Sequence, residues 1–181
     1  MQNTLQIDDR VAVNKLPFIA KSVKRGDVVV FRDPANWLPL PVEEVSGNKV
    51  IATVKEALVF TGVLPNPAKQ YLVKRVIGVA GDKVVCCDAK GGLTINGKAT
   101  HEPYIFAGNK PSEMNFNVTV PEGKIWVMGD HRGASADSRY HQDDVNNGMV
   151  PVSKVTGRVF GIIWPLKNFG YVASHDPLAT K

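Results

Sequence analysis

Residues 71–79 read Tyr71-Leu72-Val73-Lys74-Arg75-Val76-Ile77-Gly78-Val79 and form the strongest β-strand signal in the chain. The run is rich in β-branched and aliphatic residues, and the turn residues Gly81-Asp82 follow it. Because side chains alternate between the two faces of a strand, Leu72, Lys74 and Val76 share one face. The sequence therefore predicts a strand whose lysine lies between two aliphatic neighbours.

Strand signals also lie on both sides of this run. They comprise residues 10–13, 27–31, 49–54, 83–87, 117–120, 125–128 and 155–164, and an Asn96-Gly97 turn within a hairpin over residues 93–100. Many short strands separated by Gly and Pro are typical of antiparallel β structure. We predict one mainly β domain over residues 1–181, with a core of about 1–82 and 123–181 and a smaller β lobe inserted at about 83–122.

Helix signals are weak. Residues 57–60 could belong to a strand or to one helical turn, and residues 135–139 could form a single turn. Residues 33–48 contain three prolines, which indicates a surface loop or a small insertion.

Composition narrows the class of protein. Of the 181 residues, 44% are hydrophobic and 22% are charged, as in ordinary globular domains. The net charge of +5 would suit nucleic acid or an anionic membrane surface, but the basic residues are scattered and match no nucleic-acid-binding motif. We therefore expect no nucleic-acid partner, and a surface that either faces lipid or is simply soluble.

Cys86 and Cys87 are the two cysteines of the chain. Neighbours on a strand point to opposite faces, so a bond between them would be strained and we expect two free thiols. The cysteines and the four histidines show no zinc-ligand spacing, so we expect no metal and no cofactor. Residues 1–181 hold no run of 18 apolar residues, and we expect none of them to span a bilayer.

Lys74 permits two interpretations. A lysine on an edge strand can extend its ammonium group to water, and for a single lysine this is the more common case. A desolvated lysine instead has a lowered pKa and can act as a general base. Strand position alone leaves both open.

A dense polar loop follows the strand signal at 125–128. It reads Gly129-Asp130-His131-Arg132-Gly133-Ala134-Ser135-Ala136-Asp137-Ser138-Arg139. The loop could be a solvated turn, or a hydrogen-bonded network in which Asp137 pairs with Arg139 or Arg132 and Ser135 offers a hydroxyl. His131 suggests a Ser-His-Asp triad, but the chain has no G-x-S-x-G elbow to support one.

Four segments, in the right order, resemble the motifs of the type I signal peptidases. They are Met1-x-x-Thr4-Leu5, resembling the end of Ser-Met-x-Pro-Thr-Leu; Gly26-Asp27-Val28-Val29-Val30-Phe31; Lys74-Arg75-Val76-Ile77-Gly78-Val79-Ala80-Gly81-Asp82; and Gly129-Asp130-His131-Arg132-x-x-Ser135-x-Asp137-Ser138-Arg139. Each motif is weak alone, whereas the third and fourth together are highly specific. The resemblance covers nearly the whole chain and implies the barrel-like, antiparallel β fold of that family.

The resemblance also implies roles for individual residues. Lys74 matches the general base, and Ser135 matches the serine that orients it. Arg75, Asp130, Asp137 and Arg139 match a structural network near the site, in which Asp137 and Arg139 form an ion pair. Leu72 and Val73 match the strand that pairs with the substrate, and Met1 and Leu5 match residues beside the nucleophile.

The family pattern expects the serine nucleophile immediately before Met1, so we expect residues 1–181 alone to be inactive. An amino-terminal transmembrane helix is expected further upstream. Asn3, Ala80 and His131 depart from the usual Pro, Pro and Asn, and none of them falls on the dyad. The native protein would be a serine endopeptidase on the extracytoplasmic face of the cell membrane, acting on signal-peptide-bearing preproteins.

Two other functions compete with this one. A noncatalytic relative could act as a binding or assembly module in secretion or pilus formation, but such a module has no need of Lys74 and Ser135. A Ser/Lys autoprotease of the SOS-repressor type would lack the Asp137-Ser138-Arg139 segment.

The last strand signal ends in aromatic residues, Trp164 and, shortly after it, Phe169 and Tyr171. They could pack in the core. They could instead form a lipid-facing rim, because aromatic rings suit the membrane interface and a signal peptide is cut there. The second interpretation predicts partly exposed rings and a membrane lipid surface as a partner.

Overall fold

The computed structural model describes residues 1–15, 23–39 and 70–179. The predicted strand at 49–54, the ambiguous segment 57–60 and residues 40–48 of the predicted loop lie outside these ranges. Most of the strong strand signals fall inside the described ranges.

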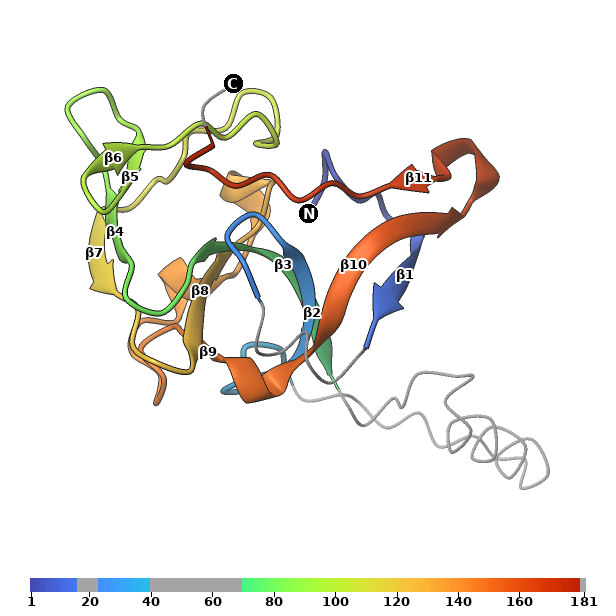
Figure 1. Ribbon diagram of the computed structural model, residues 1–181, viewed down its shortest axis with the longest axis horizontal. Coiled ribbons are helices and arrows are strands. Elements are labelled where there is room, and N and C mark those ends of the chain that lie inside the picture. Colours follow the sequence, from blue (N-terminus) through green and yellow to red (C-terminus); the bar gives the residue numbers. More distant parts are fainter. Residues whose placement is uncertain (16–22, 40–69, 180–181) are drawn as a thin grey trace.

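Antiparallel β-sheet dominates the described residues (Figure 1). The larger sheet has the strand order β1-β10-β2-β3-β8-β9, with β11 also paired to β10. Its strands are β1 (Arg10–Asn14), β2 (Val28–Arg32), β3 (Tyr71–Gly78), β8 (Lys124–Met128), β9 (Val150–Pro151), β10 (Val155–Trp164) and β11 (Gly170–Tyr171). The prediction of a mainly antiparallel β fold is confirmed.

The barrel-like part of that expectation is not met in the described ranges. Closure would require β1 to pair with β9, and these strands are the two ends of the hydrogen-bonded order. β9 consists of Val150 and Pro151, and Pro151 has no backbone N–H to donate to a further strand. The larger sheet is therefore open.

A smaller sheet has the order β6-β5-β4-β7. It comprises β4 (Lys83–Cys86), β5 (Leu93–Ile95), β6 (Lys98–Ala99) and β7 (Phe116–Thr119). The predicted Asn96-Gly97 turn joins β5 to β6, and both residues have positive φ, as this kind of turn requires. The sheet falls within residues 83–122, and the division of the chain into a core and an inserted lobe stays a prediction.

The helical elements of the described residues are short 3-10 turns. They are η2 (Arg132–Ala134), η3 (Ser138–Tyr140), η4 (Val152–Lys154) and η5 (Leu166–Asn168). The single turn expected at residues 135–139 is thus replaced by two turns, on either side of an extended Ser135.

Three hydrophobic clusters hold the sheets together. One joins the smaller sheet to the larger through Ile77, Trp126 and Met128. A second fills one face of β2, β3 and β8 and includes Leu72 and Val76. The third is centred on Leu5, Val28, Val159 and Val172, with Met1 and Val73 packed against it. This third cluster fixes the amino-terminal segment beside β3.

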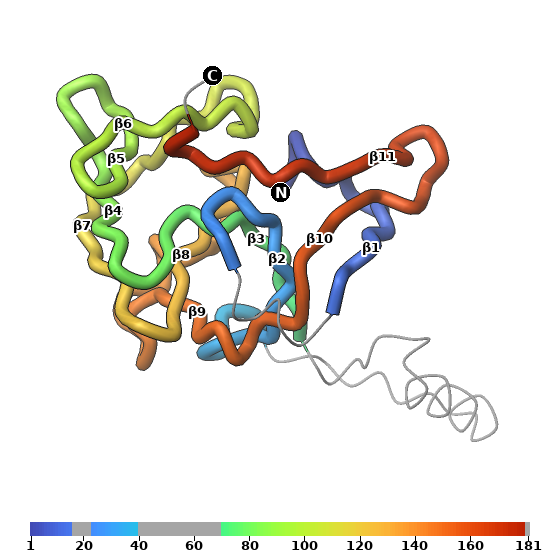
Figure 2. The backbone as a smooth tube through the Cα atoms, in the orientation of Figure 1, coloured from blue at the N-terminus to red at the C-terminus, as the bar shows by residue number. Residues whose placement is uncertain are grey.

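The segment after β11 runs back across the amino terminus toward the smaller sheet (Figure 2). It comes so close to Gly26 that a Cβ there would lie 2.2 Å from the backbone of His175. Gly26 also has φ +84°, which an L side chain rarely adopts. The glycine of the second motif is therefore required by the passage of the carboxy-terminal segment.

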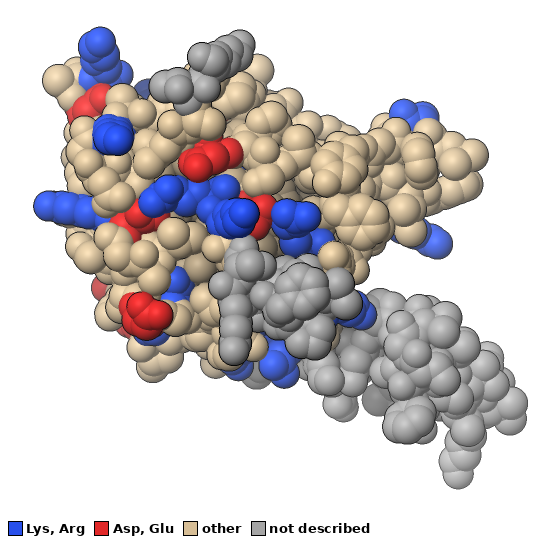
Figure 3. Space-filling model, viewed as in Figure 1, with Lys and Arg blue, Asp and Glu red and all other residues tan. Residues whose placement is uncertain are grey.

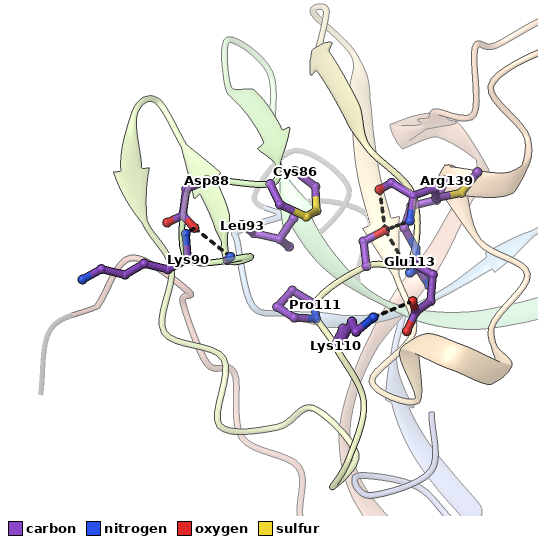
Figure 4. Close-up of a disulfide and its surroundings, with 12 residues drawn as sticks. Cys86, Asp88, Lys90, Leu93, Lys110, Pro111, Glu113 and Arg139 are labelled. Carbon is purple, nitrogen blue, oxygen red and sulfur yellow. Dashed lines mark hydrogen bonds and ion pairs between the residues drawn. A yellow bond between two sulfur atoms is a disulfide. The ribbon is translucent and has the colours of Figure 1, made fainter.

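Cys86 and Cys87 form a disulfide, so the expectation of two free thiols is wrong. That expectation assumed an ordinary strand through both residues. β4 ends at Cys86, so Cys87 lies outside the strand and the alternation of side chains along a strand does not extend to it. Figure 4 shows the disulfide beside Leu93, the β5 partner of Cys86.

Candidate active site

Strand register brings Lys74 next to the polar loop. β3 pairs with β2 along residues 71–75, with Lys74 opposite Val29. On its other side, β3 pairs with β8 from Arg75, which lies opposite Met128. β8 ends at Met128 and the chain turns away as the loop of residues 129–139. Lys74 is thus the first β3 residue beyond the β8 pairing, where the loop can reach it.

The Lys74 ammonium group meets the hydroxyl of Ser135. Lys74 Nζ donates a hydrogen bond to Ser135 Oγ at 2.9 Å, and Ser135 is buried. Burial lowers the pKa of Lys74 below its ordinary value; the charge of Asp137 opposes the shift and that of Arg139 adds to it. A lysine of this kind loses its proton more easily than one in water and can then accept a proton from another group.

Gly129 leaves the space that Ser135 occupies. A Cβ on Gly129 would lie 2.2 Å from Ser135 Oγ and 2.6 Å from Ser135 Cβ. The Gly129 N–H donates to Asp137 Oδ2 at 2.9 Å, which ties the start of the loop to its end. The position of the Ser135 hydroxyl therefore depends on a glycine six residues earlier in the chain.

Asp137 pairs with Arg139, one of the two partners that the sequence left open. Arg139 Nε and Nη2 donate to the two Asp137 carboxylate oxygens at 2.8 and 2.9 Å, and both side chains are fully buried. Arg132 pairs instead with Glu102. The two ion pairs are linked, because Arg139 Nη2 also donates to the Arg132 carbonyl at 2.8 Å.

Arg75 and Asp130 form a second buried pair. Arg75 Nε and Nη2 donate to Asp130 Oδ1 and Oδ2 at 2.9 and 2.7 Å, and Nη1 donates to the Gly26 carbonyl at 2.8 Å. Thr4 completes the network: its hydroxyl donates to Asp130 and accepts from Arg75 Nη2 at 3.1 Å. A buried bidentate pair of this kind fixes geometry, here between β3, the loop and the amino-terminal segment.

The amino-terminal segment closes over the site. The backbone N–H groups of Thr4 and Leu5 both donate to the Met1 carbonyl, which makes a tight turn. The pKa of the Met1 amino group is lowered, first by burial and then by the positive charge of Lys74. Met1 is therefore partly buried and close enough to Lys74 for its charge to act on the amino group. Leu5 is buried in the third cluster.

Leu72 and Val73 lie on opposite faces of β3. Leu72 is buried in the second cluster, and Val73 is partly buried against the third, which includes Leu5. In the described residues, β3 residues 71–74 have their ladder partners in β2, and β8 pairs only further on. Along residues 71–74, the described strands therefore pair with β3 on the β2 side.

His131 contacts Gln2 and Phe106 rather than the partners of a Ser-His-Asp triad. Its Nδ1 lies 2.6 Å from Gln2 Oε1, and its ring stacks on Phe106 at 4.3 Å. Three further residues of the network carried no role in the sequence analysis: Thr4, Glu102 and Tyr104. Thr4 stood in a quoted motif without a role, whereas nothing in the sequence marked Glu102 or Tyr104.

The aromatic residues at the end of β10 are exposed. Trp164, Phe169 and Tyr171 are 51%, 70% and 76% exposed, and Ile163 and Leu166 nearby are exposed too. In the face drawn in Figure 3, the protruding end of the β10–β11 hairpin is mostly uncharged, with Lys and Arg side chains at its margins. An apolar rim of this kind on a protein surface usually has a partner.

Within residues 1–15, 23–39 and 70–179, no helix is long and apolar enough to cross a membrane. No three His, Cys, Asp or Glu side chains gather there as metal ligands.

A lysine buried against a hydroxyl in a β domain makes this a candidate hydrolase site. A family model described as signal peptidase, peptidase S26, matches residues 1–164. The chain is 39% identical to the probable signal peptidase I of Mycobacterium leprae, over 93% of this chain and 65% of that protein. It is 40% identical to the signal peptidase I of Mycobacterium tuberculosis and 31% identical to the probable signal peptidase I-2 of Synechocystis, each over 94% of this chain and 62% of the relative.

The chain therefore belongs to the signal peptidase family, as its motifs predicted. It spans less than two thirds of the length of these three relatives.

Proposed function

We propose that this protein is a serine endopeptidase that removes amino-terminal signal peptides from secreted preproteins. The observation that carries the proposal is the 2.9 Å hydrogen bond between Lys74 Nζ and Ser135 Oγ. Burial also lowers the pKa of the same lysine. A structural or binding role would not need a desolvated lysine bonded to a hydroxyl. Burying such a group costs free energy, and a general base repays that cost in function.

The nucleophile in this proposal is the hydroxyl of a serine that directly precedes Met1 in the protein. Met1 supports this position, because it packs against the third cluster together with Val73, the β3 neighbour of Lys74. Neutral Lys74 would take the hydroxyl proton as the serine attacks the scissile carbonyl, and would then return the proton to the leaving amine. Ser135 would hold the Lys74 amine in line through its hydrogen bond.

The substrate would bind as an added strand. Residues 71–74 of β3 offer their backbone groups at the edge beside Lys74, and an extended peptide could pair there. Val73 and Leu5, which meet in the third cluster, would help to line pockets for small apolar side chains of the signal peptide.

The membrane surface is the proposed place of action, on the extracytoplasmic face, with a transmembrane helix preceding the catalytic segment in the native protein. The exposed Trp164, Phe169 and Tyr171 support contact with lipid, because aromatic rings favour the region between headgroups and acyl chains. The net charge of +5 would add attraction to anionic headgroups.

The test compares three chains: residues 1–181 alone, the same chain with a serine placed before Met1, and the serine-bearing chain with Lys74→Met. Each is incubated with a preprotein, and mass spectrometry identifies the cut. The proposal expects cleavage after the signal peptide by the second chain only. Equal cleavage by residues 1–181 alone would mean that another nucleophile acts and would overturn the mechanism. Stable binding of the preprotein without cleavage by any chain would favour the noncatalytic alternative.

A further inference from the structure

The segment between β6 and β7 returns to the active site. Its residues 102–106, which we call the strut, contact the three parts that make up the site: the amino-terminal segment, β3 and the loop of residues 129–139. None of the four signal peptidase motifs includes the strut.

Tyr104 is the centre of these contacts. Its ring lies against the Arg75 guanidinium, with the Arg75 Cζ atom 4.1 Å from the ring centre. Its backbone carbonyl accepts a hydrogen bond from Asn3 Nδ2 at 3.0 Å, and its hydroxyl donates to Glu102 Oε1 at 2.9 Å. The whole residue is only 5% exposed.

The two ends of the strut hold the loop. Glu102 forms the buried ion pair with Arg132, and the Phe106 N–H donates to the Asp130 carbonyl at 2.9 Å. The Phe106 ring stacks on His131, which in turn contacts Gln2. The strut therefore holds the loop and the amino-terminal segment from the same side.

We propose that Tyr104 is a positioning residue: by packing on Arg75 and holding Asn3, it sets the place of the amino-terminal segment relative to Lys74. Arg75 is the connection, since it binds both Asp130 of the loop and Thr4 of that segment. A guanidinium over an aromatic ring gains an electrostatic attraction that grows when both are desolvated, as they are here. The proposal rests on the proposed function in so far as the positioned segment carries the nucleophile.

Phe116 provides a matched control within the same hydrophobic cluster. It is also a buried aromatic residue, but its ring packs at a tilt against Trp126, at 5.3 Å between ring centres, rather than against Arg75. Tyr104→Leu and Phe116→Leu should therefore cost similar stability. Only Tyr104→Leu removes a contact to Arg75.

The first measurement does not need catalysis. Trace acetylation of residues 1–181 across a pH series, followed by mass spectrometry of the Lys74 peptide, reports the pH at which Lys74 loses its proton. We expect the midpoint of this curve to move upward, toward that of an ordinary lysine, in Tyr104→Leu, because a displaced Met1 admits water to Lys74. Tyr104→Phe keeps the ring, and Phe116→Leu leaves Arg75 untouched, so both should match the parent.

The second measurement is cleavage by the serine-bearing chain. Misplacement of a reacting group by about 1 Å can cost roughly 100-fold in rate, so Tyr104→Leu should lower kcat by about 10- to 100-fold with little change in KM. Tyr104→Phe should restore most of it. If the serine-bearing parent does not cleave, the proposed function fails, while the acetylation curves still decide the positioning role.

Should Tyr104→Leu fail to fold, Asn3→Gly replaces it. Glycine tolerates the φ of +92° at this position, and the change removes the amide that donates to the carbonyls of Tyr104 and Ile105 in the strut. A raised Lys74 midpoint in either variant, absent in Phe116→Leu, supports the proposal. The proposal is overturned if the Lys74 midpoint is unchanged in a folded Tyr104→Leu chain. If Tyr104→Leu does not fold, an unchanged midpoint in Asn3→Gly overturns it instead. An equal shift in Phe116→Leu overturns it in either case.

Discussion

Lys74 Nζ and Ser135 Oγ meet at 2.9 Å although 61 positions separate them in the chain. The contact exists because β3 and β8 pair only up to Arg75 and Met128, so the loop after β8 folds over the next β3 residue. Burial is the main cause of the lowered pKa of Lys74, and the loop also contributes the opposing charges of Asp137 and Arg139.

Ser135→Ala tests the partner of the lysine. The change removes the hydroxyl that accepts the hydrogen bond of Lys74 Nζ, and a freely rotating amine is a poorer base. We expect kcat of the serine-bearing chain to fall by at least about tenfold, with a similar melting temperature. Ser153→Ala, at an exposed position in η4, is the control and should keep full activity. Full activity in Ser135→Ala would remove this residue from the mechanism.

Gly129→Ala tests the space under Ser135. The new methyl carbon would lie 2.2 Å from Ser135 Oγ, so the loop must shift, at a cost of about 1–3 kcal/mol in the free energy of unfolding. Gly133→Ala is a matched control in the same loop, because its nearest neighbour would be Asn109 Oδ1 at 3.7 Å. Urea unfolding measures both variants. Equal stability of the two would contradict the tight packing described here.

The pH dependence of stability tests the desolvation of Lys74. Its pKa in the folded chain lies below the ordinary 10.5, so the unfolded chain binds more protons between these two values. The free energy of unfolding contributed by Lys74 should therefore rise with pH across that window. Lys74→Met should flatten the rise without loss of stability at pH 7, because no charge then has to be buried.

Urea unfolding between pH 6 and pH 10 compares the stability of Lys74→Met with that of the parent chain. Lys83→Met, at an exposed position, serves as the control. The control should follow the parent curve. A parent curve that coincides with that of Lys74→Met would show that the lysine is hydrated in the folded chain.

Liposome flotation tests the apolar rim. Residues 1–181 should float with anionic vesicles at low salt, and added salt should weaken the binding by screening the headgroups. Trp164→Ala should weaken it as well. Tyr140→Ala is the control, since Tyr140 has the same 51% exposure but lies in η3 rather than in the β10–β11 hairpin. No flotation at low salt would remove the membrane contact of this rim.

Local signals predicted most of the strands that the structure describes. Alternation placed Leu72 and Val76 in one cluster and Val73 on the other face, as in any half-buried strand. Pairing over long distances was harder. The loop residues alone left open whether Asp137 binds Arg139 or Arg132, and only the family resemblance implied Arg139. The choice depends on Glu102, which pairs with Arg132 from a separate segment.

The sequence held no local signal for two features, the contact of Tyr104 with Arg75 and the Cys86–Cys87 disulfide. Tyr104 contacts Arg75 through the path of the strut, which depends on how the smaller sheet packs on the larger. Strand geometry made a Cys86–Cys87 bond look strained, but the strand ends at Cys86. The end of an element is the least certain part of a sequence-based prediction.

The central claim is that Lys74 is desolvated enough to act as a base. NMR titration of residues 1–181, with lysine amines labelled by reductive ¹³C-methylation and Lys74→Met used to assign the Lys74 signal, measures its pKa directly. We expect the Lys74 midpoint to lie clearly below that of the other lysines. It should fall further in Ser135→Ala, because the charged amine then loses the hydroxyl that accepts its hydrogen bond. A Lys74 signal that titrates together with the exposed lysines, near their ordinary pKa of about 10.4, would contradict the account.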